Sequence, residues 1–221
     1  FMGTPEFALP TLRALHHSSH SIQAVITQAD KPKGRGQKIF VSPVKQYALD
    51  SNLPILQPKT VNEPEFIESL KKNRPDIVIV VAFGQILSEN FLKIPIQFCV
   101  NLHSSLLPKY RRAAPIHRAI LNGDNKSGVT TMIMDKGMDT GDILLMQETP
   151  INETDNAQTL HDTLSKLGGT LVLETIKRLE ENTLLPVPQD HNQATYATKL
   201  KKEEGLICWE LPAVTLLNQV R

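Results

Sequence analysis

Short apolar runs alternate with amphipathic stretches along most of the chain. The runs with the length of strands lie at 22–27, 76–83, 98–103, 129–135 and 143–148, and the run at 53–57 fits a short strand or an extended segment. The run at 76–83, DIVIVVAF, is apolar at nearly every position, which is typical of a strand buried on both faces of a parallel sheet. The last two strands are joined by a polar, glycine-containing loop and predict a hairpin-like unit at one sheet edge.

Helical patterns lie between these strands. Thr4, Pro5 and Glu6 suit the N-cap, the first position and the first turn of a helix that continues to about Leu15. Leucines at helical spacing predict a long helix within 154–179. The alternation of strands and helices predicts an α/β fold. The other expected helices lie at 44–50, 63–72, 88–92 and 116–122.

The domain boundary is expected where two prolines, Pro186 and Pro188, end the helical pattern. We therefore expect one domain over residues 1–185 and, at 186–221, a linker with a short helix after Leu211. The chain opens on what resembles the tail of a strand and closes within a helical pattern. We expect it to be a fragment at both ends.

Composition narrows the function classes. The chain has 221 residues, 40% hydrophobic, and its 24 Lys and Arg nearly balance 23 Asp and Glu. This suits one large α/β domain, or one domain with a small appendage, and a sizeable core. It excludes a globally basic protein, so that any basic patch is local. Cys99 and Cys208 lack metal-ligand spacing, which predicts no metal site and a reducing compartment. No apolar run approaches the roughly 20 residues of a membrane span, so we expect a cytoplasmic protein without a membrane partner.

The run at 98–103 ends in a group of candidate catalytic residues. Side chains two apart on a strand share a face, so Asn101 and His103 would project together. The carboxyl end of a strand in an open parallel sheet is where such folds bind ligands. An amide can stabilise an oxyanion, and an imidazole can move a proton near neutral pH. Asp139, in the sequence MDTGD, is the candidate acid that orients the imidazole or completes a proton relay.

The reaction class follows from what these residues can and cannot do. An Asn-x-His pair at a strand end is more often a structural hydrogen-bond pair than a catalytic one. The combination of NLHSSLLP, MDTGD and a polar loop after a buried strand favours catalysis. No GxSxG elbow surrounds Ser104 or Ser105, so the set predicts direct acyl transfer to an amine through a tetrahedral intermediate. Asn101 would hold the negative oxygen, while His103 and Asp139 would move the protons.

A basic segment at 30–45, DKPKGRGQKIFVSPVK, has no acidic residue after Asp30. Its glycines and prolines predict a flexible loop. Such a loop is either a solvated surface loop or a contact to a phosphate backbone that becomes ordered on binding. Its cations are Lys31, Lys33, Arg35, Lys38 and Lys45.

Three segments, FMGTPEFALPTL, NLHSSLLPKYRRAAPIHRAI and GMDTGDILL, resemble the formyltransferases that use 10-formyltetrahydrofolate. Within that group, DKPKGRGQK followed by SPVK is similar to the basic inserted loop of the methionyl-tRNA formyltransferases, and the resemblance extends over essentially the whole chain. It implies a Rossmann-like fold, with an open, mostly parallel twisted sheet and helices on both faces. It also implies a monomer that transfers the formyl group of 10-formyltetrahydrofolate to initiator methionyl-tRNA for translation initiation.

The resemblance implies roles for individual residues. The catalytic asparagine, histidine and aspartate would be Asn101, His103 and Asp139. The residues implied to contact folate are Phe83, Gly84, Gln85, Ile86, Leu87, Ser105, Leu106, Leu107, Pro108, Gly137 and Met138. Those implied to contact the tRNA, with Arg35 as the leading candidate, are Lys31, Lys33, Arg35 and Lys38.

Two features depart from the family pattern. Arg112 stands where the family usually has glycine, so that the backbone after Pro108 differs slightly or carries an extra cation. The chain also stops where the family continues into a small β-barrel domain that helps to hold tRNA. We therefore expect weaker tRNA binding than in a complete member of the family.

Two other functions fit parts of the pattern. The first keeps the same formyl donor and changes the acceptor to a small amine, an amino-sugar nucleotide or glycinamide ribonucleotide, but such an acceptor does not need the basic segment. The second is an RNA-binding module with a degenerate folate pocket. It does not explain why Asn101, His103 and Asp139 are all present.

Overall fold

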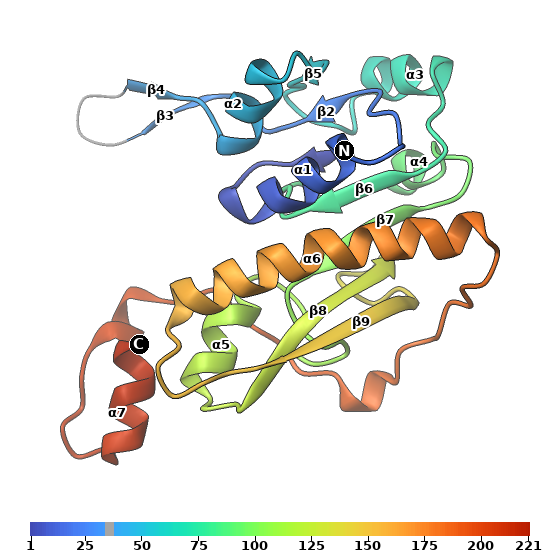
Figure 1. Cartoon of the computed structure of the whole chain (residues 1–221). Coiled ribbons are helices and arrows are strands. Elements are labelled where there is room, and N and C mark those ends of the chain that lie inside the picture. The colour runs from blue at the N-terminus through green and yellow to red at the C-terminus, as the bar shows by residue number, and fades with distance from the viewer. Residues whose placement is uncertain (34–37) are drawn as a thin grey trace.

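The computed structural model describes the backbone of residues 1–33 and 38–221, and the side chains of residues 1–30 and 40–221. A seven-stranded sheet has the strand order β5-β2-β1-β6-β7-β8-β9 (Figure 1). The strands from β5 to β7 in this order are parallel, and β8 pairs antiparallel with β7 and β9. The expected mostly parallel sheet with an antiparallel pair at one edge is confirmed. The strands are β1 Met2–Gly3, β2 Val25–Ile26, β5 Ile55–Leu56, β6 Val78–Val81, β7 Cys99–His103, β8 Lys126–Ile133 and β9 Ile143–Pro150.

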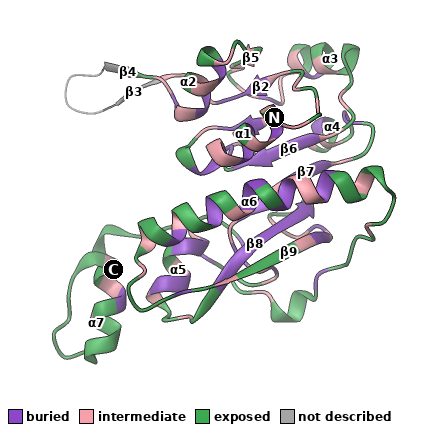
Figure 2. Cartoon of the chain, in the orientation of Figure 1, coloured by how far each residue is buried: buried purple, intermediate pink, exposed green. Residues whose placement is uncertain are grey.

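Helices cover both faces of this sheet. In β6, Val78 and Val80 pack in a core with α3 and α4, whereas Ile79 and Val81 pack in a larger core with α1, α2, α5 and α6. The strand is therefore buried on both faces, as its continuous apolar sequence predicts, and Figure 2 shows buried positions along β6, β7 and β8. The helices are α1 Leu9–His16, α2 Pro43–Asp50, α3 Pro64–Lys72, α4 Glu89–Leu92, α5 Pro115–Leu121, α6 Ala157–Glu180 and α7 Ala213–Val220.

The start of the first helix differs from the prediction. A 3₁₀ turn, Glu6–Ala8, precedes α1; its N-cap is Pro5, and no side chain caps it. The hydroxyl of Thr4 instead donates to the carbonyl of Phe83 at 3.4 Å and accepts from the backbone N–H of Gln28 at 3.3 Å. The predicted Thr4 N-cap is therefore wrong, because this hydroxyl joins the loops that follow three neighbouring strands.

Two stretches of the basic segment, which was expected to be a flexible loop, form strands, and its last residues lie in α2. β3 Lys31–Lys33 and β4 Lys38–Phe40 pair antiparallel in a separate two-stranded sheet, with Pro32 opposite Ile39. A proline is tolerated here because both strands of such a sheet are edge strands. The loop prediction is wrong for these two stretches. Arg35 lies outside the described residues.

The first part of the predicted linker at residues 186–221 lies against the start of β9 and the loop that follows β7. Val187 and Ile143 exchange two backbone hydrogen bonds of 2.8 Å. Arg111 donates its backbone N–H to the carbonyl of Thr195 at 2.9 Å, and its own carbonyl accepts from Ala197 at 2.7 Å. These contacts bring the returning chain next to the loop that follows β7.

Candidate active site

β7 presents Asn101 and His103 on one face of the sheet. Val100 and Leu102 pack in the core on the opposite face, as the alternation along a strand requires. Asn101 pairs with Val80 of β6 and with Met132 of β8. Its side chain is half-buried, and its amide has no hydrogen-bond partner among the residues described. The amide therefore keeps its N–H donors available.

The backbone of the following loop fixes the ring of His103. The ring is buried, and its Nε2 lies 2.9 Å from the carbonyl oxygen of Tyr110. A carbonyl oxygen can only accept, so Nε2 carries the hydrogen, and in the neutral imidazole the lone pair is on Nδ1. This nitrogen lies 3.9 Å from Oδ1 of Asp139. The free lone pair of the histidine thus faces the carboxylate across a short gap.

The carboxylate of Asp139 is positioned by two backbone features. Asp139 has a positive φ of 59°, in the left-handed region that aspartate tolerates better than most residues. Its Oδ2 accepts a hydrogen bond of 2.6 Å from the backbone N–H of Arg112. Asn101, His103 and Asp139 come from β7 and the β8–β9 loop. The structure brings His103 and Asp139 together, with Asn101 on the same strand face as His103.

The loop that carries Asp139 is also held internally. The carboxylate of Asp135 accepts from the backbone N–H of Gly137 at 3.0 Å and from the hydroxyl of Thr140 at 2.8 and 2.9 Å. A Cβ at Gly137 would lie 1.9 Å from Oγ1 of Thr140, so a side chain does not fit there. Gly137 therefore shapes the loop, while the side chain of Met138 beside it is 54% exposed.

In the loop after β6, most of the residues predicted to contact a ligand have side chains that are buried or hydrogen-bonded within the protein. Phe83 and Leu87 are buried, and the side chain of Gln85 accepts from the backbone N–H of Val61 at 3.0 Å. Gly84 has a positive φ of 86°, which glycine adopts without strain. Ile86, by contrast, is 74% exposed. Of these side chains, that of Ile86 is the one most open to a ligand.

The segment after β7 offers mainly its backbone. Ser105 is buried, and its hydroxyl donates to the carbonyl of Lys109 at 2.6 Å. Leu107 is also buried, and its backbone N–H donates to the hydroxyl of Thr130 at 3.2 Å. The peptide bond between Leu107 and Pro108 is cis. The side chains of Ser105 and Leu107 are thus already committed within the protein.

Leu106 packs on the neighbouring strand. A Cβ added to Gly128 of β8 would lie 2.5 Å from Cδ2 of Leu106, so the leucine covers the space that this glycine leaves open. On the same loop, Arg112 has a positive φ of 84°, the conformation that favours glycine. Its guanidinium lies 4.7 Å from the centre of the Tyr196 ring. Arg112 therefore adds a cation to the loop after β7, and the loop still adopts the backbone conformation that favours glycine.

Gln189 and Arg111 are two buried residues next to the site that sequence patterns did not reveal. Nε and Nη2 of Arg111 donate to Oε1 of Gln189 at 3.2 and 2.7 Å. Nε2 of Gln189 donates in turn to the carbonyls of Asp139 and Gly141 at 3.0 and 2.7 Å. The two residues are 78 positions apart, so no local spacing could reveal the pair.

The antiparallel pair of β3 and β4, with the basic residues of 31–38, is called the basic hairpin below. Its base is tied to the domain by Asp30. Lys45 and Asp30 form an ion pair, and Nε2 of Gln57 donates to Asp30 at 3.0 Å. The hydrogen bond from Lys45, with that from Gln57, lowers the pKa of Asp30, against the smaller effect of burial. Lys45 is thus engaged by an acid. The side chains of Lys31, Lys33, Arg35 and Lys38 lie outside the described residues.

The described ranges, 1–33 and 38–221, contain neither a cluster of metal ligands nor a membrane-spanning helix. No three His, Cys, Asp or Glu residues there are grouped so that they could hold a metal ion, and no helix is long and apolar enough to cross a membrane. Cys99, at the start of β7, is a free thiol whose burial raises its pKa to about 12. Such a thiol stays protonated and unreactive at neutral pH.

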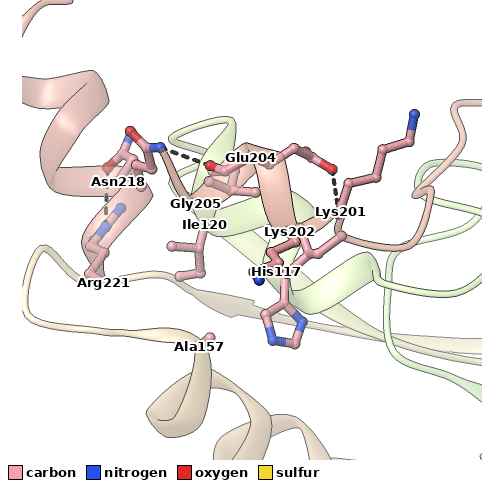
Figure 3. Close-up of a pocket in the computed structure, with 12 residues that line it drawn as sticks. His117, Ile120, Ala157, Lys201, Lys202, Glu204, Gly205, Asn218 and Arg221 are labelled. Carbon is pink, nitrogen blue, oxygen red and sulfur yellow. Dashed lines mark hydrogen bonds between the residues drawn. The ribbon is translucent and has the colours of Figure 1, made fainter. Parts of the chain in front are cut away.

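A cavity of about 320 Å³ lies elsewhere, among α5, the start of α6 and the end of the chain (Figure 3). Its lining includes His117, Ile120, Asn218 and Glu204, and Glu204 is paired with Arg118. Hydrogen bonding from Arg118 lowers the pKa of Glu204 to about 2. None of Asn101, His103 and Asp139 lines this cavity, so it is separate from the candidate active site.

Comparison with known proteins identifies the class of the fold. Residues 1–176 match the family described as formyl transferase. The N-formyltransferase of Helicobacter canadensis, solved with folinic acid and dTDP-3-aminofucose, is 25% identical with a TM-score of 0.76; the match covers 100% of this chain and 78% of that one. Phosphoribosylglycinamide formyltransferase of Bacillus halodurans shares the fold at 22% identity and a TM-score of 0.65, covering 80% and 92% of the two chains.

Relatives of known name are more similar in sequence. The methionyl-tRNA formyltransferase of Trichlorobacter lovleyi is 52% identical over the whole chain, which spans 70% of that protein. That of Caldanaerobacter subterraneus subsp. tengcongensis is 50% identical over the whole chain, and 72% of its length is covered. The chain therefore belongs to the formyl transferase family and, within it, to the methionyl-tRNA formyltransferases.

Proposed function

We propose that this chain transfers the formyl group of 10-formyltetrahydrofolate to the α-amino group of methionine on initiator methionyl-tRNA, as a monomeric cytoplasmic enzyme of translation initiation. The observation that carries the proposal is that the full chain is 52% and 50% identical to two methionyl-tRNA formyltransferases. The meeting of His103 and Asp139 beside the unpaired amide of Asn101 supports it, since these groups suit acyl transfer.

In the proposed reaction, the amine of methionine attacks the formyl carbon and forms the new C–N bond. The formyl oxygen becomes an oxyanion, to which the amide of Asn101 donates. Nδ1 of His103, which has the free lone pair, accepts the proton that the amine loses. The bond between the formyl carbon and N10 of the folate then breaks, and the charged imidazole returns its proton to N10. Asp139, 3.9 Å from Nδ1, stabilises the charged imidazole in between.

The proposed folate site lies between the loops after β6, β7 and β8. Ile86 and Met138 give it exposed apolar side chains, at 74% and 54% exposure, which suit the face of a planar heterocycle. Buried residues such as Phe83 and Leu107 shape the loops, and their backbone groups are what can meet the ligand edge. The chemistry of these groups fits a folate, and we propose no metal in the reaction.

The basic hairpin favours tRNA over a small acceptor. A nucleic acid presents a row of phosphates that several cations can contact, and we propose Arg35, Lys31, Lys33 and Lys38 for this role. A second candidate acceptor is an amino-sugar nucleotide, because the Helicobacter canadensis relative was solved with dTDP-3-aminofucose. That relative is 25% identical, about half the identity of the methionyl-tRNA formyltransferases.

The test is labelled formyl transfer from 10-formyltetrahydrofolate, offered in parallel to charged initiator tRNA and to an amino-sugar nucleotide. We expect label on methionyl-tRNA alone. Label on the amino sugar alone would mean that the acceptor is a small amine, while the proposed transfer chemistry would stand. Label on neither acceptor, with folate bound, would overturn the proposed function.

A further inference from the structure

Gln189 lies at the centre of a hydrogen-bond network behind the candidate catalytic residues. It is 6% exposed, and its side-chain oxygen receives two hydrogen bonds from Arg111, which is 2% exposed. Its nitrogen donates to two carbonyls of the β8–β9 loop, those of Asp139 and Gly141. A single amide thus ties the segment after β7 to the loop that carries Asp139.

The backbone on each side of Arg111 holds one of the candidate catalytic side chains. The carbonyl of Tyr110 accepts the hydrogen of His103 Nε2, and the backbone N–H of Arg112 donates to Oδ2 of Asp139 at 2.6 Å. The side chain of Arg111, between them, is fixed by Gln189. Fixing Arg111 therefore fixes the positions of both the histidine and the aspartate.

The chemistry of Arg111 makes a simple packing role a poor explanation. A fully buried arginine is costly unless it is paired, and an apolar side chain of similar volume fills such a space at no electrostatic cost. Arg111 has no carboxylate within ion-pair distance among the residues described; its partners are Gln189 and Nδ1 of His191, at 3.0 Å. Neutral partners in a fixed geometry orient the guanidinium without cancelling its charge.

We propose that Gln189 is a positioning residue for formyl transfer, which acts through Arg111 and the β8–β9 loop to set the distance between His103 and Asp139. The proposal rests on the function proposed above. It assigns Gln189 no contact with either substrate. Its role is to keep Asp139 within reach of Nδ1 and of the Arg112 N–H.

Two substitutions separate positioning from stability. Gln189→Met keeps the length of the side chain and removes all its hydrogen bonds. Gln189→Glu keeps an acceptor for Arg111, now as an ion pair, but sets a carboxylate oxygen against the carbonyls of Asp139 and Gly141. The matched control is Gln193→Met, because Gln193 is exposed on the same segment and bonds Asp190 instead.

We expect kcat to fall by roughly ten- to a hundred-fold in both Gln189 variants, as is typical of a misplacement of about 1 Å, with the KM for folate unchanged. The melting temperature of Gln189→Glu should stay at or above that of the parent. The Gln193→Met control should keep its kcat. Formyl transfer by the parent protein tests the proposed function separately. If the parent is active and kcat is unchanged in both Gln189 variants, the positioning role is wrong and the proposed function stands.

An observable independent of activity completes the test. Hydrogen exchange of the Arg112 amide reports whether its bond to Asp139 persists. We expect this amide to exchange faster in Gln189→Met and Gln189→Glu, and at the parental rate in Gln193→Met. Parental exchange in all three variants would mean that Asp139 keeps its place without Gln189, and the proposal would be wrong.

Discussion

The sequences of the Asp139 loop and of the basic hairpin both suggest function, but the protein holds the two regions differently. The loop is fixed from within by Asp135 and from outside by Gln189 and Arg112. β3 and β4 form a sheet of their own, and Asp30 ties its base to the domain through Lys45 and Gln57.

The contrast follows from what each region is proposed to bind. Acyl transfer needs reacting groups placed within a fraction of an ångström, which demands a loop with many fixed partners. A nucleic acid is a long, charged acceptor that attracts cations over several ångströms, so a protruding hairpin suffices. Changes in the first region should therefore affect the rate of the chemical step, and changes in the second should affect binding.

The largest expected effect comes from removing a candidate catalytic group. His103→Ala should lower kcat by about 10²- to 10⁴-fold and Asn101→Ala by about 10²- to 10³-fold, because proton transfer and oxyanion stabilisation contribute at this level. Steady-state formyl transfer at saturating substrates measures both. The control is His117→Ala, because His117 is an exposed histidine on α5, and this variant should keep the parental kcat. Near-parental turnover by His103→Ala would refute the proposed proton transfer.

A smaller effect is expected from the hairpin. Arg35→Ala should weaken tRNA binding and reduce the slope of log affinity against log salt by about 1, because one phosphate contact is lost. Affinity measured at several salt concentrations checks this. Lys72→Ala on α3 makes the same charge change on an exposed helix and should leave the slope unaltered. An affinity loss with an unchanged slope would show that Arg35 contacts something other than phosphate.

The base of the hairpin should respond to acid. Because Lys45 lowers the pKa of folded Asp30, the pair stabilises the protein above the unfolded pKa of about 3.9, and this contribution disappears as pH falls through the folded pKa. Asp30→Asn should therefore lower the free energy of unfolding by at most about 1 kcal/mol at pH 7. Denaturation at pH 7 and at pH 2 to 3 measures the difference. A difference that grows in acid would contradict this assignment.

The smallest effect is expected at Arg112. Glycine relieves a positive φ of 84° but loses the contact with Tyr196, so Arg112→Gly should change stability by less than about 1 kcal/mol. Arg112→Ala loses the same contact and keeps the backbone strain, so it should be less stable than Arg112→Gly. Thermal unfolding of the two variants gives the order. The reverse order would mean that backbone strain does not decide stability at this position.

The sequence predicted what depends on local spacing. The apolar run around Val80 gave a buried central strand, and the spacing of Asn101 and His103 correctly placed them on one face of β7. The antiparallel pair β8–β9 at the sheet edge followed from two strand-like runs around a glycine-containing loop. These patterns depend on residues a few positions apart, where strand periodicity acts directly.

Contacts between distant segments could not be predicted. The hydroxyl of Thr4 was expected to cap a helix, but it bonds the loop after β6, 79 positions away. Arg111 and Gln189 look like ordinary surface residues in sequence, because only the folded chain brings residue 189 back to the loop after β7. The β3 and β4 strands were missed because Pro32 and the neighbouring Gly34 and Gly36 favour a loop in sequence, whereas a proline is tolerated in an edge strand.

The most direct test of the contrast is the single-turnover rate of formyl transfer, measured as a function of tRNA concentration for the parent protein, His103→Ala and Arg35→Ala. We predict that Arg35→Ala reaches the parental rate at saturating tRNA, whereas His103→Ala stays slow at every concentration. An Arg35→Ala protein that remained slow at saturation, or a His103→Ala protein that recovered the parental rate, would contradict the assignment of chemistry to the β7 site and of acceptor binding to the hairpin.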